Sequence, residues 1–169
     1  MDAGLLIARL VFGLLMAAHG TQKLLGWFGG YGLAGTGGFF ESLGFRPGRF
    51  FAGVAALSEL VGGLLIATGL LGPVGPALVL AVMVVAALAV HAQHGVFAAS
   101  NGIEVPLLYA TAAVSLGLIG PGSYSLDAGL GLESVWTPGL VWSVLAVGAI
   151  GGVLNLGLRR TPQQVPAAS

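Results

Sequence analysis

The sequence predicts an all-α protein, a polytopic bundle of transmembrane helices. Of its 169 residues, 56% are hydrophobic and 7% are charged, whereas about a quarter of a soluble domain is charged. Five apolar segments are long enough to cross about 30 Å of hydrocarbon at about 1.5 Å per residue. The net charge is zero, so we expect no nucleic-acid partner. The lack of cysteine excludes thiol–disulfide chemistry and iron–sulfur ligation within the chain.

The five predicted spans follow one another through mostly short connections. In chain order they cover residues 3–25, 51–71, 73–92, 105–119 and 138–158. The first lacks a basic leader and a small-residue cleavage site, so we interpret it as a retained helix. Leu71, Gly72 and Pro73 allow only a tight hairpin, and Pro73 suits the first turn of a helix. The fourth span is the shortest, at about 15 residues before Gly120.

The connection 26–49 is predicted to be an interfacial lid. Its aromatic residues Trp27, Phe28 and Tyr31 are typical of the lipid headgroup zone. Thr36 is a candidate cap for a short helix that ends near Gly44. Residues 30–35 spell G-x-G-x-x-G, but no βαβ pattern surrounds them, so we expect no dinucleotide site. At the other end of the chain, the polar tail 161–169 is predicted to be disordered.

Positive charges predict the orientation in the membrane. Lys23, Arg46 and Arg49 flank the first connection, and Arg159 and Arg160 follow the fifth span. Basic residues favour the cytoplasmic side. With five crossings, we therefore expect the N-terminus outside and the C-terminus in the cytoplasm.

The few polar residues of the spans are predicted to meet at one face of the bilayer. By rise, His19 lies about 9 Å and Glu59 about 12 Å from that face. Alternate crossings return the chain to the same side, which gives this set: His19, Lys23, Glu59, His91, His94, Asn101 and Glu104. An ionisable group in hydrocarbon costs about 2.5 kcal/mol or more. We therefore interpret the set as a functional site.

Within this set, Glu59, His19 and Lys23 are the candidate catalytic residues. A ligand-binding or proton-relay role is assigned to His91, His94, Asn101 and Glu104. The alternative is a structural ion pair of Glu59 with His19, Lys23 or Arg9, since structural networks also bury charge.

Two further polar features lie outside the candidate catalytic group. His91 and His94, spaced i,i+3, are enough with the carboxylates for a haem or metal site. Histidines at a helix end are more simply explained by the helix dipole, so we predict no metal. Arg9 lies nearer the outer end and either extends outward or pairs structurally with Asp127.

The fifth span contains a small-xxx-small pattern. Gly148 and Gly152 predict close helix packing, either within the chain or in a homo-oligomer. Asn155 is the interior polar group of this span, and no chemistry follows from it.

Four motifs together resemble the DoxX family of membrane proteins. They are the run HGTQKLLGWFGG at 19–30, ELVGG at 59–63, NGIE at 101–104 and GPGSYSLD at 120–127. The similarity covers about residues 4–130. It implies a four-helix core over residues 1–130, with an additional transmembrane helix and tail at 131–169. It also implies a bacterial cytoplasmic-membrane protein linked to redox chemistry, since relatives include a subunit of a thiosulfate:quinone oxidoreductase.

Three functions follow from these residues and the resemblance. The first is a redox-linked component that binds a quinone or similar lipid-soluble carrier through the buried Glu/His/Lys cluster. Membrane or soluble redox proteins would then exchange its electrons, and whether the chain is itself an enzyme is left open. The second is a non-enzymatic membrane anchor or scaffold for soluble redox partners. The third is a transporter of a small solute or protons, because carboxylates inside membranes often mark ion paths.

Overall fold

The computed structural model describes residues 2–160, and within this range the chain forms helices and no strands. The predicted all-α class is therefore confirmed. The α-helices are α1 (Asp2–Leu25), α2 (Gly32–Ser42), α3 (Gly48–Thr68), α4 (Val74–Ala86), α5 (Glu104–Ile119), α6 (Leu126–Leu130) and α7 (Pro138–Leu156). Short helical turns are η1 (Trp27–Gly29), η2 (Ala87–His91), η3 (Ala92–His94), η4 (Ala98–Ser100) and η5 (Glu133–Val135). The predicted disordered tail at 161–169 lies outside the described residues.

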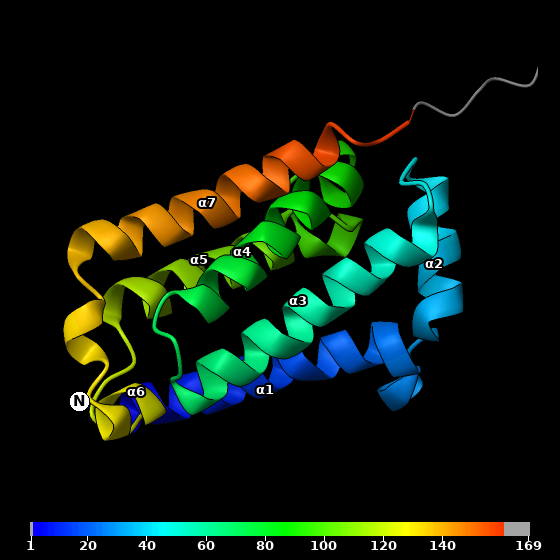
Figure 1. Cartoon of the computed structure of the whole chain (residues 1–169). Helices are drawn as coiled ribbons and strands as arrows, with labels where there is room; N and C mark the ends of the chain where they lie inside the picture. Colours follow the sequence, from blue (N-terminus) through cyan, green and yellow to red (C-terminus); the bar gives the residue numbers. More distant parts are fainter. Residues whose placement is uncertain (1, 161–169) are drawn as a thin grey trace, which may run out of the picture.

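Four helices have the length and apolar composition of membrane spans. They are α1, α3, α7 and the continuous helix Val74–His94 that begins with α4. Helix α5 has 16 residues and is the short span that the sequence predicts. Figure 1 shows these five helices running along the same direction, with α1 and α3 at one edge, α4 and α5 in the middle and α7 at the other edge. A multi-pass membrane protein follows from these helices.

Glycines let the long helices touch backbone to backbone. A Cβ atom built at Gly13 of α1 would lie 2.5 Å from the carbonyl oxygen of Gly63 in α3. On α7, a Cβ at Gly148 would lie 2.5 Å from the oxygen of Ala77, and one at Gly152 would lie 2.7 Å from that of Ala81. The small-xxx-small pattern of the fifth span therefore packs on α4 within the chain. A homo-oligomer stays a prediction.

Helix α2 begins earlier than the sequence predicts. Its N-cap is Tyr31, so Thr36 lies inside the helix and is buried, and the prediction of Thr36 as a cap is wrong. Glycine-rich segments are poor helix formers, but here tertiary packing outweighs that preference. Gly37 faces α3 so closely that a Cβ atom would lie 2.8 Å from Cγ of Arg49. The helix ends at Ser42, just before Gly44, as expected.

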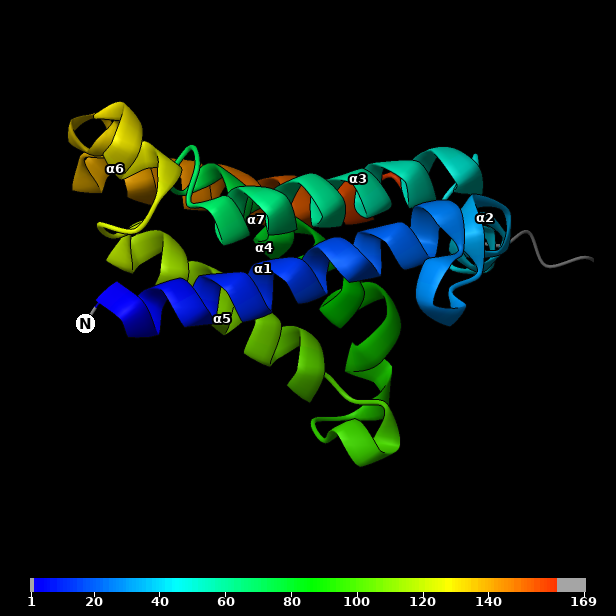
Figure 2. The ribbon, with the colours of Figure 1, turned by 90° about the horizontal axis from the view of Figure 1, so that it is seen from below.

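Different segments of the chain lie at the two ends of the bundle. The α6 end contains the N-terminus, the α3–α4 turn and α6, and the α2 end contains α2 and the last turn of α7 (Figures 1 and 2). At the α2 end, the backbone N–H of Arg160 donates to the oxygen of Gly44 over 2.8 Å. Figure 2 also shows that the α4–α5 connection projects sideways from the bundle on the side of α5.

Candidate functional site

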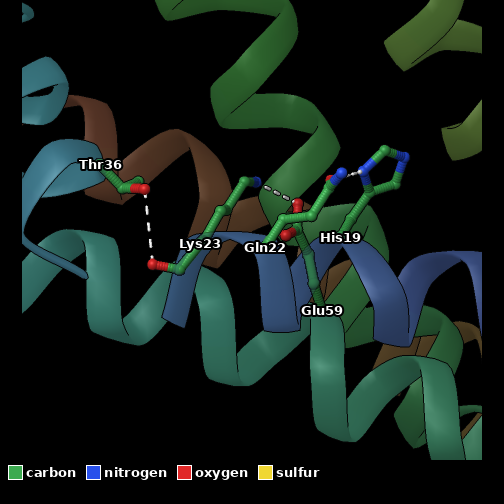
Figure 3. A network of polar contacts seen from close by, with 5 residues as sticks. All are labelled: His19, Gln22, Lys23, Thr36 and Glu59. Atoms are coloured by element: carbon green, nitrogen blue, oxygen red, sulfur yellow. Dashed lines mark hydrogen bonds and ion pairs between the residues drawn. The ribbon is translucent and has the colours of Figure 1, made fainter. Parts of the chain in front are cut away.

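The centre of the site is a buried ion pair between α1 and α3. The Lys23 ammonium donates to Oε1 of Glu59, and this is the one ion pair among residues 2–160 (Figure 3). The Lys23 side chain is 31% exposed and that of Glu59 is 2% exposed. The sequence predicts that both residues lie near this face of the bilayer, with Lys23 as one of three possible partners of Glu59. The structure shows the pair of Glu59 with Lys23.

Close helix approach explains why the pair forms. One turn before Lys23, a Cβ at Gly20 would lie 2.6 Å from the oxygen of Ala56 and from the nitrogen of Leu60. The two helix axes are therefore near enough for a lysine on α1 to reach the carboxylate next to Leu60 on α3. The second carboxylate oxygen of Glu59, Oε2, is buried and has no hydrogen-bond partner among the described residues.

Other polar side chains surround the pair without joining it directly. His19 Nδ1 donates to Oε1 of Gln22 over 3.0 Å, and Gln22 Nε2 donates to the carbonyl oxygen of Phe28 over 3.1 Å. The Thr36 hydroxyl donates to the carbonyl oxygen of Lys23 over 3.4 Å (Figure 3). His19 therefore lies beside the predicted catalytic pair, but its hydrogen bond is to Gln22 and not to Glu59.

An apolar cavity of about 380 Å³ opens next to Lys23. Helices α2, α3, α4 and α7 form its wall, together with η2. Its aromatic wall consists of Phe39, Phe40, Phe45 and Phe51, and its polar lining includes Lys23, Thr36, Ser58, His91 and Asn155. Among the described residues that line it, Lys23 and His91 are the ionisable ones. We call it the apolar cavity.

The aromatic wall is well ordered by packing. Phe45 is fully buried, and its ring centroid lies 5.6 Å from that of Phe40 and 5.2 Å from that of Phe51. The sequence carries no sign of this cavity. Its residues come mainly from five α-helices and η2, and no spacing along the chain relates them.

The remaining residues of the predicted cluster fix the turn between α4 and α5. His91 Nδ1 donates to the carbonyl oxygen of Asn101 over 2.7 Å. Oε2 of Glu104 accepts the backbone N–H of Ala98 over 2.7 Å, and Nε2 of His94 lies 3.3 Å from the amide nitrogen of Gln93. Of the four predicted relay residues, His91 alone is among those that line the apolar cavity.

Within residues 2–160, no three His, Cys, Asp or Glu side chains lie close enough together to hold a metal ion.

Arg9 and Asp127 lie at the α6 end, each with partners of its own. The guanidinium of Arg9 is 3% exposed and donates to the carbonyl oxygens of Pro121 and Tyr124, the latter over 2.7 Å. Its burial rules out the outward extension considered from the sequence. Within the described chain the only ion pair is that of Lys23, so the predicted pairing of Arg9 with Asp127 is not a direct one.

The carboxylate of Asp127 instead ties three segments together. It accepts the backbone N–H groups of Leu71 and Gly72 over 2.9 and 2.7 Å, and the indole N–H of Trp136 over 2.8 Å. The carboxylate on α6 therefore binds the α3–α4 turn and the segment that leads into α7. Trp136 was not recognised in the sequence, because no motif marks an indole that donates to a carboxylate in a neighbouring turn.

Comparison with known proteins identifies the family. The DoxX family matches residues 4–92, which is just over half of the chain and includes Lys23, Glu59 and His91. The match is shorter than the resemblance seen in the sequence and ends before Asn101. No curated protein and no solved structure matches the chain. On the strength of this match and the bundle of apolar helices, the chain belongs to the DoxX family of integral membrane proteins.

Proposed function

We propose that this protein is a redox-linked membrane component that binds a quinone, or a similar lipid-soluble carrier, in the apolar cavity. The observation that supports this most is the position of Lys23, whose ammonium is held by buried Glu59 and lines an aromatic-walled cavity among membrane helices. A quinone needs flat apolar walls for its ring and hydrogen-bond donors for its carbonyl oxygens. Both are available at this place.

The residues present fit such a ligand. The cavity volume of about 380 Å³ is within the range of small-molecule sites, about 300 to 1,000 Å³. Four phenylalanine rings supply apolar area, and Lys23 and the amide of Asn155 supply donors. His91 uses Nδ1 for Asn101, which leaves Nε2 as an acceptor for a quinol hydroxyl.

The residues of this chain have distinct roles in the proposal. When a quinone is bound, its reduction to a quinol takes up a pair of electrons and a pair of protons. Lys23 donates a hydrogen bond to the ligand and delivers the two protons in turn, taking up a proton from water after the first transfer, and it is the catalytic residue. Glu59 is a positioning residue that holds the Lys23 ammonium in place. His19 is hydrogen-bonded to Gln22 and does not line the apolar cavity. The turn that contains His94, Asn101 and Glu104 holds His91 at the cavity wall.

Electrons must come from another protein. The chain contains no cysteine, and the residues that line the apolar cavity are not electron carriers by themselves. We therefore propose a membrane or soluble redox protein as partner. In this proposal the chain is one component of an oxidoreductase. Whether the chain catalyses a reaction without that partner is a separate question.

The α2 end is the side on which a partner would meet the membrane. Besides Lys23, the basic residues Arg46, Arg49, Arg159 and Arg160 belong to segments that gather at this end. We propose that it faces the cytoplasm of a bacterial cell, with the N-terminus outside.

A membrane anchor for soluble partners is the alternative. The observation that favours it is the exposure of Trp27, Phe28 and Tyr31, which are 58%, 71% and 86% exposed around the start of α2. In that case the ion pair only stabilises the bundle, and the apolar cavity has no quinone.

The test is binding of a short-chain quinone to the detergent-solubilised protein. Lys23→Met removes the donor, and Gly151→Phe fills the cavity, because Gly151 lines it and a Cβ there meets nothing within 4 Å. The matched control is Gly139→Phe on the same helix, where a Cβ also meets nothing within 4 Å. We expect Lys23→Met and Gly151→Phe to weaken binding about tenfold or more, equivalent to about 1.4 kcal/mol, and the control to bind normally. If the wild-type protein binds no quinone, or all variants bind it equally, the anchor explanation is favoured.

A further inference from the structure

A second cavity lies on the other side of Lys23. Its volume is about 560 Å³, and it lies between the last turn of α1 and α2. Gln22, Tyr31 and several glycines line it, and it shares Lys23, Thr36 and Phe39 with the apolar cavity. We call it the interfacial cavity. Lys23 is the one ionisable side chain that lines both cavities among the described residues.

The surroundings of the interfacial cavity are those of the membrane surface. Tyr31 at its wall is 86% exposed, and the neighbouring Trp27 and Phe28 are 58% and 71% exposed. Aromatic residues of this kind mark the headgroup level. The Gln22 amide, the Thr36 hydroxyl and the Lys23 ammonium give ordered water several partners there, which a polar and roomy site needs.

We propose that the interfacial cavity is a water-filled entry that brings protons to Lys23. The exposed fractions of the two side chains support proton entry at Lys23, because the Lys23 side chain is 31% exposed and that of Glu59 is 2% exposed. The lysine is therefore accessible from the cavities, whereas the carboxylate is enclosed. Transfer of a proton breaks one N–H bond of the ammonium and forms an O–H bond on the ligand, and the neutral amine then takes a proton from a hydronium ion in the cavity.

This route replaces the relay that the sequence suggested through His91 or Glu104. The Nδ1 atom of His91 is bound to Asn101, and Oε2 of Glu104 to the Ala98 amide, in a connection that projects on the side of α5. The interfacial cavity lies instead beside α2. Water entry depends on this chain alone, and only the transfer to a ligand rests on the function proposed above.

The cysteine-free chain permits a direct test of water entry. Gln22→Cys and Ser58→Cys each place a thiol at a half-buried position, and Gln22 lines only the interfacial cavity whereas Ser58 lines only the apolar one. Each variant is placed in proteoliposomes and treated with a charged, membrane-impermeant methanethiosulfonate. We expect Gln22→Cys to react at least about tenfold faster than Ser58→Cys. Treatment with a lipid-soluble maleimide in detergent shows that both thiols are reactive.

Equal rates for the two thiols, or protection of Gln22→Cys, would overturn water entry. The modified Gln22→Cys variant then tests proton delivery, because its enlarged side chain fills the interfacial cavity and leaves the apolar one untouched. Proton uptake is followed with a pH dye during chemical reduction of the bound short-chain quinone. We expect modification to slow uptake about tenfold with unchanged quinone affinity. Unchanged uptake would refute delivery through this cavity, whereas failure of the wild type to bind quinone would refute the proposed function alone.

Discussion

Loss of Lys23 should destabilise the protein more than loss of Glu59, although both variants break the same ion pair. Lys23→Met leaves a carboxylate that is 2% exposed and has one oxygen already without a partner. Removal of one member of a buried pair costs about 3 to 5 kcal/mol. The lower value applies, since the Lys23 side chain is 31% exposed and the pair is only partly desolvated. We therefore expect about 3 kcal/mol for Lys23→Met.

Glu59→Gln leaves the more exposed partner behind. The Lys23 side chain already keeps 31% of its exposure, so its ammonium can turn to water with little desolvation. We expect a loss of about 1 to 2 kcal/mol. The double variant should lose about 1 to 2 kcal/mol less than the sum of the single variants, because it leaves no charge unpaired.

The measurement is a double-mutant cycle from reversible unfolding in detergent. Ser58→Ala, one residue before Glu59, serves as the control and should change the unfolding free energy by less than about 0.5 kcal/mol. Equal losses for the two single variants, or a larger loss for Glu59→Gln, would show that burial of the carboxylate does not set the cost of breaking the pair.

Three other substitutions test the packing of the bundle and its α6 end. Gly63→Ala should cost about 2 kcal/mol in thermal unfolding, because its Cβ would lie 2.5 Å from the Ala17 nitrogen. The control Gly139→Ala should cost almost nothing, since a Cβ there meets nothing within 4 Å. Equal stabilities of the two variants would contradict the close α1–α3 contact. Asp127→Asn should cost about 1 to 3 kcal/mol in unfolding free energy, since one amide oxygen then replaces two carboxylate oxygens as the acceptor of three N–H groups. An unchanged unfolding free energy would contradict the role of Asp127 as a buried acceptor. Gly148→Val should loosen α7 from α4 and speed protease cleavage before residue 138, and cleavage at the wild-type rate would argue against that contact.

The helices could be predicted from the sequence because their signals are local. The apolar runs gave the five long helices to within a few residues, since polar or glycine- and proline-containing segments interrupt them. Pro73 forms the N-cap of α4, directly before the first turn in which it was expected. The start of α2 was missed, because packing of Gly37 on α3 decides it and no residue near Thr36 indicates that contact.

The site was only partly predictable for the same reason. Helical rise placed His19 and Glu59 at similar depth, with Lys23 one turn nearer the surface, and the buried pair of Lys23 and Glu59 was among the alternatives. Neither cavity was foreseen, because a cavity depends on how side chains from several helices meet. Arg9 binds the backbone oxygens of Pro121 and Tyr124, and every residue has such an oxygen, so nothing in the sequence marks these two.

The contribution of α7 to the apolar cavity has a consequence for biogenesis. Gly151, Gly152 and Asn155 complete a wall whose other residues come from earlier in the chain. A ribosome makes α7 after α1 to α6, when Lys23 and Glu59 have already entered the bilayer. The ion pair can therefore form in a growing chain while the chamber beside it still faces lipid. A message that ends before residue 138 would yield the charges without a closed chamber, so occupancy of that chamber reports synthesis and insertion of the chain through α7.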